Sequence, residues 1–448
     1  MKEKNNQIEM TSGNSLSIII RFSIPLILTA FFSQLYSFID SMIVGRCISE
    51  EALAAVNLTS SLNFLIMGIT MGSALGFCIP FGQSVGASDK KMYSKYFYNG
   101  LYLSIFLSVL LTIIFVPNTN NLLVMINTPD NLINMSKNYL IIIFIGLLIT
   151  TMYHFFAGIM RSLGNSKQPF YFMLAGNIIN VGLDLLFIVT FNMNVQGAAL
   201  ATILSQLISL LLCIYYLFKK MRQIDNNERQ INKQCIYKLV TVGMPMGLEL
   251  SVNAIGSVVL QGCVNKLGSV VVTAVAAGEK IRSMITLPLE NLGSAMSTYT
   301  AQNYGAKNKE RIKDGIKSSV IILVTYCAFA YLLVFILKKP LVSLLLGNTT
   351  SESAKATVEY LSLISTLFVA HGALQIFRNI LQGMGHSVPA LLSGVFEIIG
   401  RVIGGSLAVY YISFEIVCFA NPMAWILAGA YCIIMTVFYL KRMNFKEE

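Results

Sequence analysis

The sequence is poor in charged residues. Asp, Glu, Lys and Arg make up 12% of its 448 residues, whereas hydrophobic residues make up 55%. Soluble domains average about 25% charged residues. This deficit excludes a soluble enzyme, because about twelve membrane helices of ~20 residues each would use nearly all of the apolar residues.

Cysteine and histidine are too scattered for a metal or redox centre. The eight cysteines occur singly in apolar runs, without the close pairs that zinc sites and redox motifs require. The sequence also lacks a recognisable phosphate-binding glycine loop and a recognisable catalytic triad. We therefore predict no cofactor, and we interpret the cysteines as small buried hydrophobic residues.

Apolar segments long enough to cross a bilayer follow one another through the chain. They predict an all-α membrane protein with twelve transmembrane helices in two six-helix lobes. The N-terminus lacks the compact apolar core and cleavage site of a signal peptide, so we expect the first span to be retained. The predicted spans cover residues 15–45, 52–80, 94–117, 132–162, 167–191, 195–219, 237–265, 270–300, 315–338, 354–384, 388–411 and 413–440.

Short motifs recur about one half-chain apart, which indicates an internal duplication. The motifs GQSVGASDKK and AQNYGAKNKE align with each other, and their matching glutamines, Gln83 and Gln302, are 219 residues apart. Pro25 and Pro245 are 220 residues apart. Six helices in each repeat mean that both halves enter the membrane from the same side, as parallel repeats. We predict an N-terminal tail over 1–14, an N-lobe over 15–219, a linking loop over 220–236, a C-lobe over 237–440 and a C-terminal tail over 441–448.

Basic residues concentrate on one side of this topology. With a cytoplasmic N-terminus, the inner segments carry 21 lysines and arginines and the outer ends carry 6. The positive-inside rule therefore predicts cytoplasmic termini for a multi-pass protein of the cell membrane. This asymmetry largely accounts for the net charge of +11, so no nucleic-acid partner is predicted.

Polar residues inside the spans are candidates for chemistry, because an ionisable side chain there costs ~2.5–3.5 kcal/mol on insertion scales. Asp40 and Asp184 lie about five and about seven residues before the outer ends of their spans, hence ~7–10 Å below one surface. Asn180 is one helical turn from Asp184, on the same face. Tyr139 and Thr202 are expected near the same surface. We predict a cation-coupling site from these five residues.

The coupling ion is left open between a proton and sodium. Two neighbouring carboxylates hold a proton more tightly than one alone, and with Asn180 they offer oxygen ligands to a small cation such as sodium. The alternative is that Asp40 and Asp184 are hydrogen-bonded structural residues.

Four segments resemble the multidrug and toxic compound extrusion (MATE) family. They are IPLILTAFFSQLYSFIDSMIVGRCISEEALAAVNL, AQNYGAKNKERI, MRSLGNSKQP and VQGAALATILSQ, and the similarity covers nearly the whole chain. The resemblance implies a two-lobe secondary transporter, not an enzyme, that exports compounds by proton or sodium antiport. Asp40 matches the first-helix carboxylate of the family, and Asn180 and Asp184 match the fifth-helix motif of its DinF-like branch.

The C-terminal half departs from the NorM-like branch of that family. That branch implies an acidic site from spans seven and ten, whereas His371 and Gly372 stand in span ten where an acid is sought. Glu249 lies a turn earlier than the glutamate of that branch. We therefore favour the DinF-like branch and keep Glu249 as a candidate for a proton or substrate role. His154 is either a proton carrier, because imidazole titrates near neutral pH, or a structural residue.

Further residues in the spans are candidates for lining a substrate cavity. Arginines that face a cavity favour anionic or zwitterionic substrates, whereas Asp40 and Glu249 favour lipophilic cations. Glu397 and Arg401 lie four residues apart on one helix face, so an internal ion pair is the alternative for that arginine. The cavity candidates are Gln34, Tyr36, Met246, Arg378 and Arg401.

These features predict an alternating-access antiporter that exports amphiphilic, cationic small molecules. Pro25 interrupts the hydrogen-bond ladder of span one, so this helix is expected to bend when Asp40 changes charge. The alternatives are an exporter of an endogenous metabolite and a lipid-linked glycan flippase of the wider superfamily. We expect a monomer.

Overall fold

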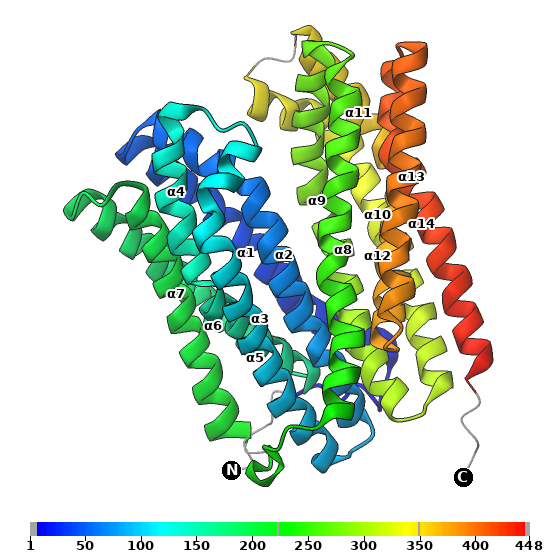
Figure 1. Ribbon diagram of the computed structural model, residues 1–448. Helices are drawn as coiled ribbons and strands as arrows, with labels where there is room; N and C mark the ends of the chain where they lie inside the picture. The colour runs from blue at the N-terminus through cyan, green and yellow to red at the C-terminus, as the bar shows by residue number, and fades with distance from the viewer. Residues whose placement is uncertain (1–6, 222–223, 348–349, 444–448) are drawn as a thin grey trace. The chain divides into compact units, whose positions relative to one another are not determined.

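The computed structural model is almost entirely helical (Figure 1). It describes residues 7–221, 224–347 and 350–443. The main α-helices of the first half of the chain are α1 (Ser15–Cys47), α2 (Glu50–Gly86), α3 (Lys90–Met125), α4 (Asp130–Ile145), α5 (Leu147–Ser162), α6 (Lys167–Asp184) and α7 (Asn194–Tyr216). The second half contains α8 (Lys233–Asn265), α9 (Ser269–Gly305), α10 (Lys309–Leu346), α11 (Glu352–Ser365), α12 (Phe368–Gly383), α13 (Ser387–Tyr411) and α14 (Phe414–Arg442).

Most of the predicted spans correspond to single long helices. Within the described residues, nine helices are long and apolar enough to cross a membrane, or eleven spans when two bent helix pairs are each counted as one. The remaining predicted span, 270–300, is the 37-residue α9. It falls outside that set because Glu279, Lys280, Arg282 and Glu290 lie within it among many serines and threonines.

Two of the predicted spans each consist of two helices that meet at a bend, so neither is one continuous helix. The segment 132–162 divides into α4 and α5, which meet at 47°, and the segment 354–384 divides into α11 and α12, which meet at 52°. The first break lies at Gly146, where the side chain of Ile203 occupies the space that a Cβ would need. Hydropathy does not reveal such breaks, because both halves of each pair are apolar.

The chain forms two compact units, and two helices belong to both. The first unit contains the chain up to Glu9 and Ile24–Leu250, and the second contains Met10–Ser23 and Ser251–Glu448. The division within α1 therefore lies next to Pro25, and the division within α8 lies five residues after Pro245.

Polar contacts fix the start of α1 within the second unit. The Ser15 Oγ and Tyr299 Oη atoms lie 2.8 Å apart. The Arg311 guanidinium donates to the Gly13 carbonyl at 2.9 Å. Because these bonds satisfy backbone and hydroxyl groups just before and at the helix start, they hold this end of α1 in place.

Equivalent contacts fix the segment before α8 within the first unit. The Tyr98 hydroxyl donates to Asn226 Oδ1 at 2.5 Å. The Asn99 side chain donates to the Gln230 carbonyl at 3.3 Å and accepts from the Asn232 amide at 2.9 Å. The start of each half is thus held by hydrogen bonds to side chains far away in the sequence.

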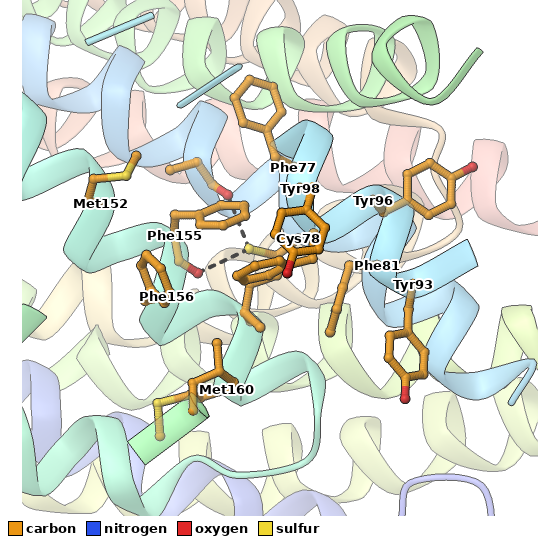
Figure 2. Close-up of a cluster of buried hydrophobic side chains, with 14 of the residues drawn as sticks. Phe77, Cys78, Phe81, Tyr93, Tyr96, Tyr98, Met152, Phe155, Phe156 and Met160 are labelled. Carbon is orange, nitrogen blue, oxygen red and sulfur yellow. Dashed lines mark hydrogen bonds between the residues drawn. The ribbon is translucent and has the colours of Figure 1, made fainter. Parts of the chain in front are cut away.

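The core of the first unit includes a cluster of aromatic side chains around Cys78 (Figure 2). Phe77 and Phe81 on α2 belong to it together with Phe155 and Phe156 on α5. The Cys78 thiol donates to the Phe155 carbonyl at 3.5 Å, so this cysteine is a packing residue as predicted. Six of the eight cysteines are buried, whereas Cys263 is partly buried, and Cys47 is exposed, which corrects its prediction as a buried residue.

Helices α2 and α8 approach closely through small residues within the first unit. A Cβ atom at Gly72 would lie 2.7 Å from the Gly247 Cα atom, and one at Gly76 would lie 2.5 Å from the Gly243 Cα atom. Gly72 and Gly76 on α2 have the Gly-xxx-Gly spacing that allows helix backbones to pack tightly in a membrane, and so do Gly243 and Gly247 on α8. The crossing therefore depends on the absence of side chains at these glycines.

This packing gives opposite expectations for two Gly→Ala substitutions. Gly76→Ala is expected to lower the thermal unfolding temperature in detergent, because overpacking typically costs about 1–3 kcal/mol. Gly262→Ala in α8 meets no atom within 4 Å, so its gain in helix propensity is expected to leave stability unchanged or slightly higher. Equal stability of the two variants would contradict the tight α2–α8 crossing.

Candidate functional site

Two carboxyl groups come together in the first unit. Asp40 on α1 and Asp184 at the end of α6 lie close enough for their side chains to interact directly. Asp184 is completely buried, whereas Asp40 is partly exposed. The structure thus brings together the two aspartates that the sequence placed at similar depth.

The backbone changes character directly after Asp184. The α-helix α6 ends at this residue and continues as a short π-helix, η1 (Leu185–Thr190). Single-turn π-helical segments inside membrane and soluble helices are frequent at functional sites, because the extra residue in the turn changes the direction of nearby side chains. Sequence periodicity did not indicate this change.

Hydroxyl groups from three helices surround the carboxyl pair. Tyr139 on α4 and Tyr36 on α1 both lie within electrostatic range of Asp40 and Asp184. The Tyr36 and Thr202 hydroxyl oxygens are 3.5 Å apart, and Thr202 also donates to a carbonyl of its own helix. Tyr36, predicted as a cavity residue, therefore lies beside the predicted coupling residues.

Several polar atoms of this site lack hydrogen bonds. Apart from the neighbouring Asp40 carboxyl, neither oxygen of Asp184 has a hydrogen-bond partner among the residues described. The amide nitrogen and oxygen of Asn180 also lack partners within the described chain, although the residue is buried. Because buried polar groups are nearly always paired, this set has the capacity to bind a further ligand.

The donor atoms of this set suit a proton or a hard cation. Asp40, Asp184 and Asn180 offer carboxylate and amide oxygens, which are ligands of hard cations. Within the ranges that the structure describes, no group of three or more His, Cys, Asp or Glu side chains could hold a metal ion. The oxygen set therefore fits sodium better than a transition metal, which prefers nitrogen or sulfur ligands.

The other candidates in the first unit lie on α1, α5 and α8. His154 on α5 faces Arg161 of the same helix. Gln34 is exposed on α1, Met246 packs beside the glycines of α2, and Glu249 is buried on α8.

Glu397 is the centre of a buried ion-pair cluster in the second unit. Its two carboxylate oxygens accept from Arg378 at 2.8 Å and from Arg401 at 3.1 Å. The Glu397–Arg401 pair was readable from their spacing on α13, but the Arg378 partner was not, because it lies on α12. Both arginines thus share one carboxylate inside the unit.

Asparagine side-chain bonds connect this cluster to a second ion pair. Arg401 Nε donates to Asn421 Oδ1 at 3.1 Å, and the Asn421 amide donates to Glu279 at 3.1 Å. Glu279 pairs with Arg282 at 2.7 Å and accepts from the Tyr360 hydroxyl. The pairing of Glu279 with Arg282 was not predicted, although their three-residue spacing was a usable signal.

The cluster predicts a specific stability effect. Glu397→Gln leaves Arg378 and Arg401 without their shared carboxylate, so we expect a loss of about 3–5 kcal/mol in unfolding free energy. Glu359→Gln, at an exposed glutamate on α11, is the matched control and should change little. Thermal unfolding in detergent measures both, and a wild-type unfolding temperature for Glu397→Gln would contradict the role of the cluster.

Comparison with protein families supports the duplicated architecture. A family model described as MatE matches residues 25–186 and 245–407. The two matches begin 220 residues apart (245 − 25), at Pro25 and Pro245. The chain therefore contains the family's unit twice, at the offset of the predicted repeat.

Curated relatives and solved structures agree with this match. The "Probable multidrug resistance protein YpnP" of Bacillus subtilis is 27% identical over 384 residues, which is 86% of each chain. An "FAD transporter" of Shewanella oneidensis is 24% identical over 280 residues, covering 61% of this chain and 62% of the relative. A MOP superfamily transporter from Pyrococcus furiosus, described with a binding pocket of reverse polarity, superposes with a TM-score of 0.91 at 20% identity over 99% of this chain and 100% of that one. This last likeness shows the shared fold.

Proposed function

Because the chain belongs to the MatE family of multidrug and toxic compound extrusion transporters, we propose that it exports amphiphilic organic cations in exchange for protons or sodium. The chain is a multi-pass membrane transporter and not an enzyme. The cation coupling rests on one observation, the Asp40–Asp184 pair with its unsatisfied oxygens.

The carboxyl pair supports exchange because two negative charges away from bulk water attract a cation strongly. A proton or a sodium ion bound between Asp40 and Asp184 removes that attraction for a cationic substrate. Substrate and coupling ion then occupy the transporter alternately, which is the requirement for antiport. Tyr139 and Thr202 supply hydroxyl groups that orient the bound ion.

Helix α1 provides a path from the carboxyl pair to the second unit. Asp40 lies on the part of α1 that belongs to the first unit, and the start of the helix belongs to the second. Pro25 lies beside the division and has no backbone N–H, so the helix is weakest there. We infer that ion binding at Asp40 changes the bend of α1 at Pro25.

The driving force is sufficient for modest concentration of a substrate. One proton moving down a gradient of one pH unit supplies about 1.4 kcal/mol, which sustains roughly a tenfold substrate gradient. A membrane potential adds about 2.3 kcal/mol per 100 mV when one net charge moves.

A second candidate function is the export of an endogenous metabolite. The relative named FAD transporter supports it. The pairing of Arg378 and Arg401 with Glu397 favours cationic substrates instead, because both guanidinium groups already donate to a carboxylate within the protein. A lipid-linked glycan flippase remains the third alternative.

The pattern of Asn180 and Asp184 on α6 favours the DinF-like branch of the family. Cytoplasmic termini and a monomeric state stay predictions.

Substitution of either aspartate should abolish coupled transport. Asp40→Asn and Asp184→Asn in proteoliposomes are each expected to reduce gradient-driven ethidium efflux at least tenfold, because the remaining acid no longer binds the coupling ion as tightly. Asp130→Asn, at an exposed position at the start of α4, is the control and should retain efflux. Undiminished efflux by Asp40→Asn would overturn the coupling role.

Separate gradients should identify the coupling ion. At least one of two imposed gradients, of pH or of sodium, is expected to drive uphill ethidium movement in the wild-type protein, because either cation fits the carboxyl pair. The gradient that drives it identifies the coupling ion. Ethidium uptake into proteoliposomes measures the effect of each gradient alone. Ethidium movement that only follows its own gradient would instead indicate a channel.

A further inference from the structure

Helix α9 has a polar face that is open on the surface of the second unit. Thr273, Lys280 and Ser294 are exposed on it, and Ser283 and Asn291 are partly buried. The three exposed residues are seven and fourteen positions apart, and each of the other two lies three positions from one of them. Because such spacings return to the same side of a helix, the five side chains share one face.

Helix α10 of the same unit has an exposed face of the opposite character. Its exposed side chains include Ile321, Phe329, Phe335 and Ile336, which are 57–62% exposed. Apolar side chains suit contact with hydrocarbon, whereas an ammonium group placed there is costly. We therefore expect the exposed face of α10 to meet lipid and the polar face of α9 to border water.

Lys280 lies on the polar face, far from both ends of α9. It follows Ser269, the first residue of the helix, by eleven positions (280 − 269), which is ~16 Å along the axis. Among the residues that the structure describes, no carboxylate forms an ion pair with its ammonium group. The adjacent Glu279 accepts from Arg282 instead. Lys280 is thus a cation at membrane depth without an acid of its own.

The interacting charges of the second unit leave no spare acid for Lys280. With His371 neutral, this set contains three arginines and three glutamates, so its formal charges cancel. Its members are Arg282, Arg378, Arg401, Glu279, Glu290 and Glu397. The charge of Lys280 therefore has no counterpart in the set, and an anion beside it would supply one.

We propose that Lys280 forms an anion-binding site on the polar face of α9, which takes the carboxylate of an amphiphilic substrate. This inference rests on the proposed export of amphiphiles. The ammonium group donates a charge-assisted hydrogen bond to the carboxylate. Met284 lies one helical turn further along and is 59% exposed, so its flexible thioether side chain contacts the apolar part of the same molecule.

The site extends the range of substrates in a direction that the carboxyl pair does not. Asp40 and Asp184 lie in the first unit and attract cations, whereas Lys280 lies in the second unit and attracts anions. The two sites share no residue. A substitution at Lys280 therefore changes the preference for a carboxylate and leaves the binding of the coupling ion unchanged.

Two dyes that differ by one charge test the site. Tetramethylrhodamine carries a carboxylate, and its methyl ester is the same fluorophore without that charge. Fluorescence polarisation with the purified protein measures both affinities in the absence of a gradient. Lys280→Gln is expected to weaken binding of the carboxylate dye about fivefold or more and to leave the ester within about twofold, because only the carboxylate loses a hydrogen bond to a charged group. Lys280→Arg should retain the wild-type affinities.

Lys266→Gln is the matched control for these measurements. Lys266 is exposed directly after α8 and does not belong to the polar face of α9, so its variant should bind both dyes as the wild-type protein does. Because Lys280 is also exposed, its variants are expected to keep the wild-type unfolding temperature. An unchanged affinity for the carboxylate dye in Lys280→Gln, or equal losses for both dyes, would refute the site.

Cysteine labelling tests whether this face borders water. In a Cys47→Ser protein, which lacks the exposed cysteine, Lys280→Cys is expected to react with a charged methanethiosulfonate, and tetramethylrhodamine should slow the reaction. Phe335→Cys, on the apolar face of α10, is the control and should not react, because a thiol in hydrocarbon does not form the reactive thiolate. A Lys280→Cys protein that does not react would contradict the proposal.

The outcomes separate this site from the proposed transport function. Discrimination between the two dyes by a protein without gradient-driven efflux disproves only the transport function. Gradient-driven ethidium efflux by a protein in which Lys280→Gln changes neither dye affinity disproves only the Lys280 site.

Discussion

A charge removed from water must be compensated, and this constraint accounts for the polar architecture of both units. In the second unit it is met by opposite charges. Glu397 accepts from two arginines, and Asn421 joins that cluster to the Glu279–Arg282 pair. Because each member has a partner within the protein, the cluster can remain buried through a transport cycle without taking up an external ion.

The first unit meets the same constraint differently. Asp40 and Asp184 have like charge and lie together, and hydroxyl groups surround them in place of basic side chains. Such a pair is unfavourable when both carboxyls are charged, so it favours a proton or another cation between them. The negative charge of the two carboxyls is not fully compensated within the protein. In a structural core this would be destabilising, but here it supports the proposed exchange of ions and substrate.

Helix α1 connects the carboxyl pair of the first unit with the second unit. Helix α1 carries Asp40 in the first unit and is anchored at its start by Tyr299 in the second. We infer that this helix, fixed at one end and weakened by Pro25, responds to a charge change by bending near that proline. The tight glycine crossing between α2 and α8 is, in contrast, expected to resist movement within the first unit.

The sequence by itself determined the helical membrane fold and the duplication, and it predicted a similar depth for the two aspartates. Those properties depend on apolar run length, motif spacing and residue rise along one helix, which are all properties of a linear chain. Only the tertiary structure decided that Arg378 pairs with Glu397, that Tyr36 lies beside the carboxyl pair, and that two predicted spans break. Partner choice depends on how each helix is rotated about its own axis and on which distant segments pack against it. Hydropathy is insensitive to both, because it records how apolar a segment is but not which of its faces meets a neighbour.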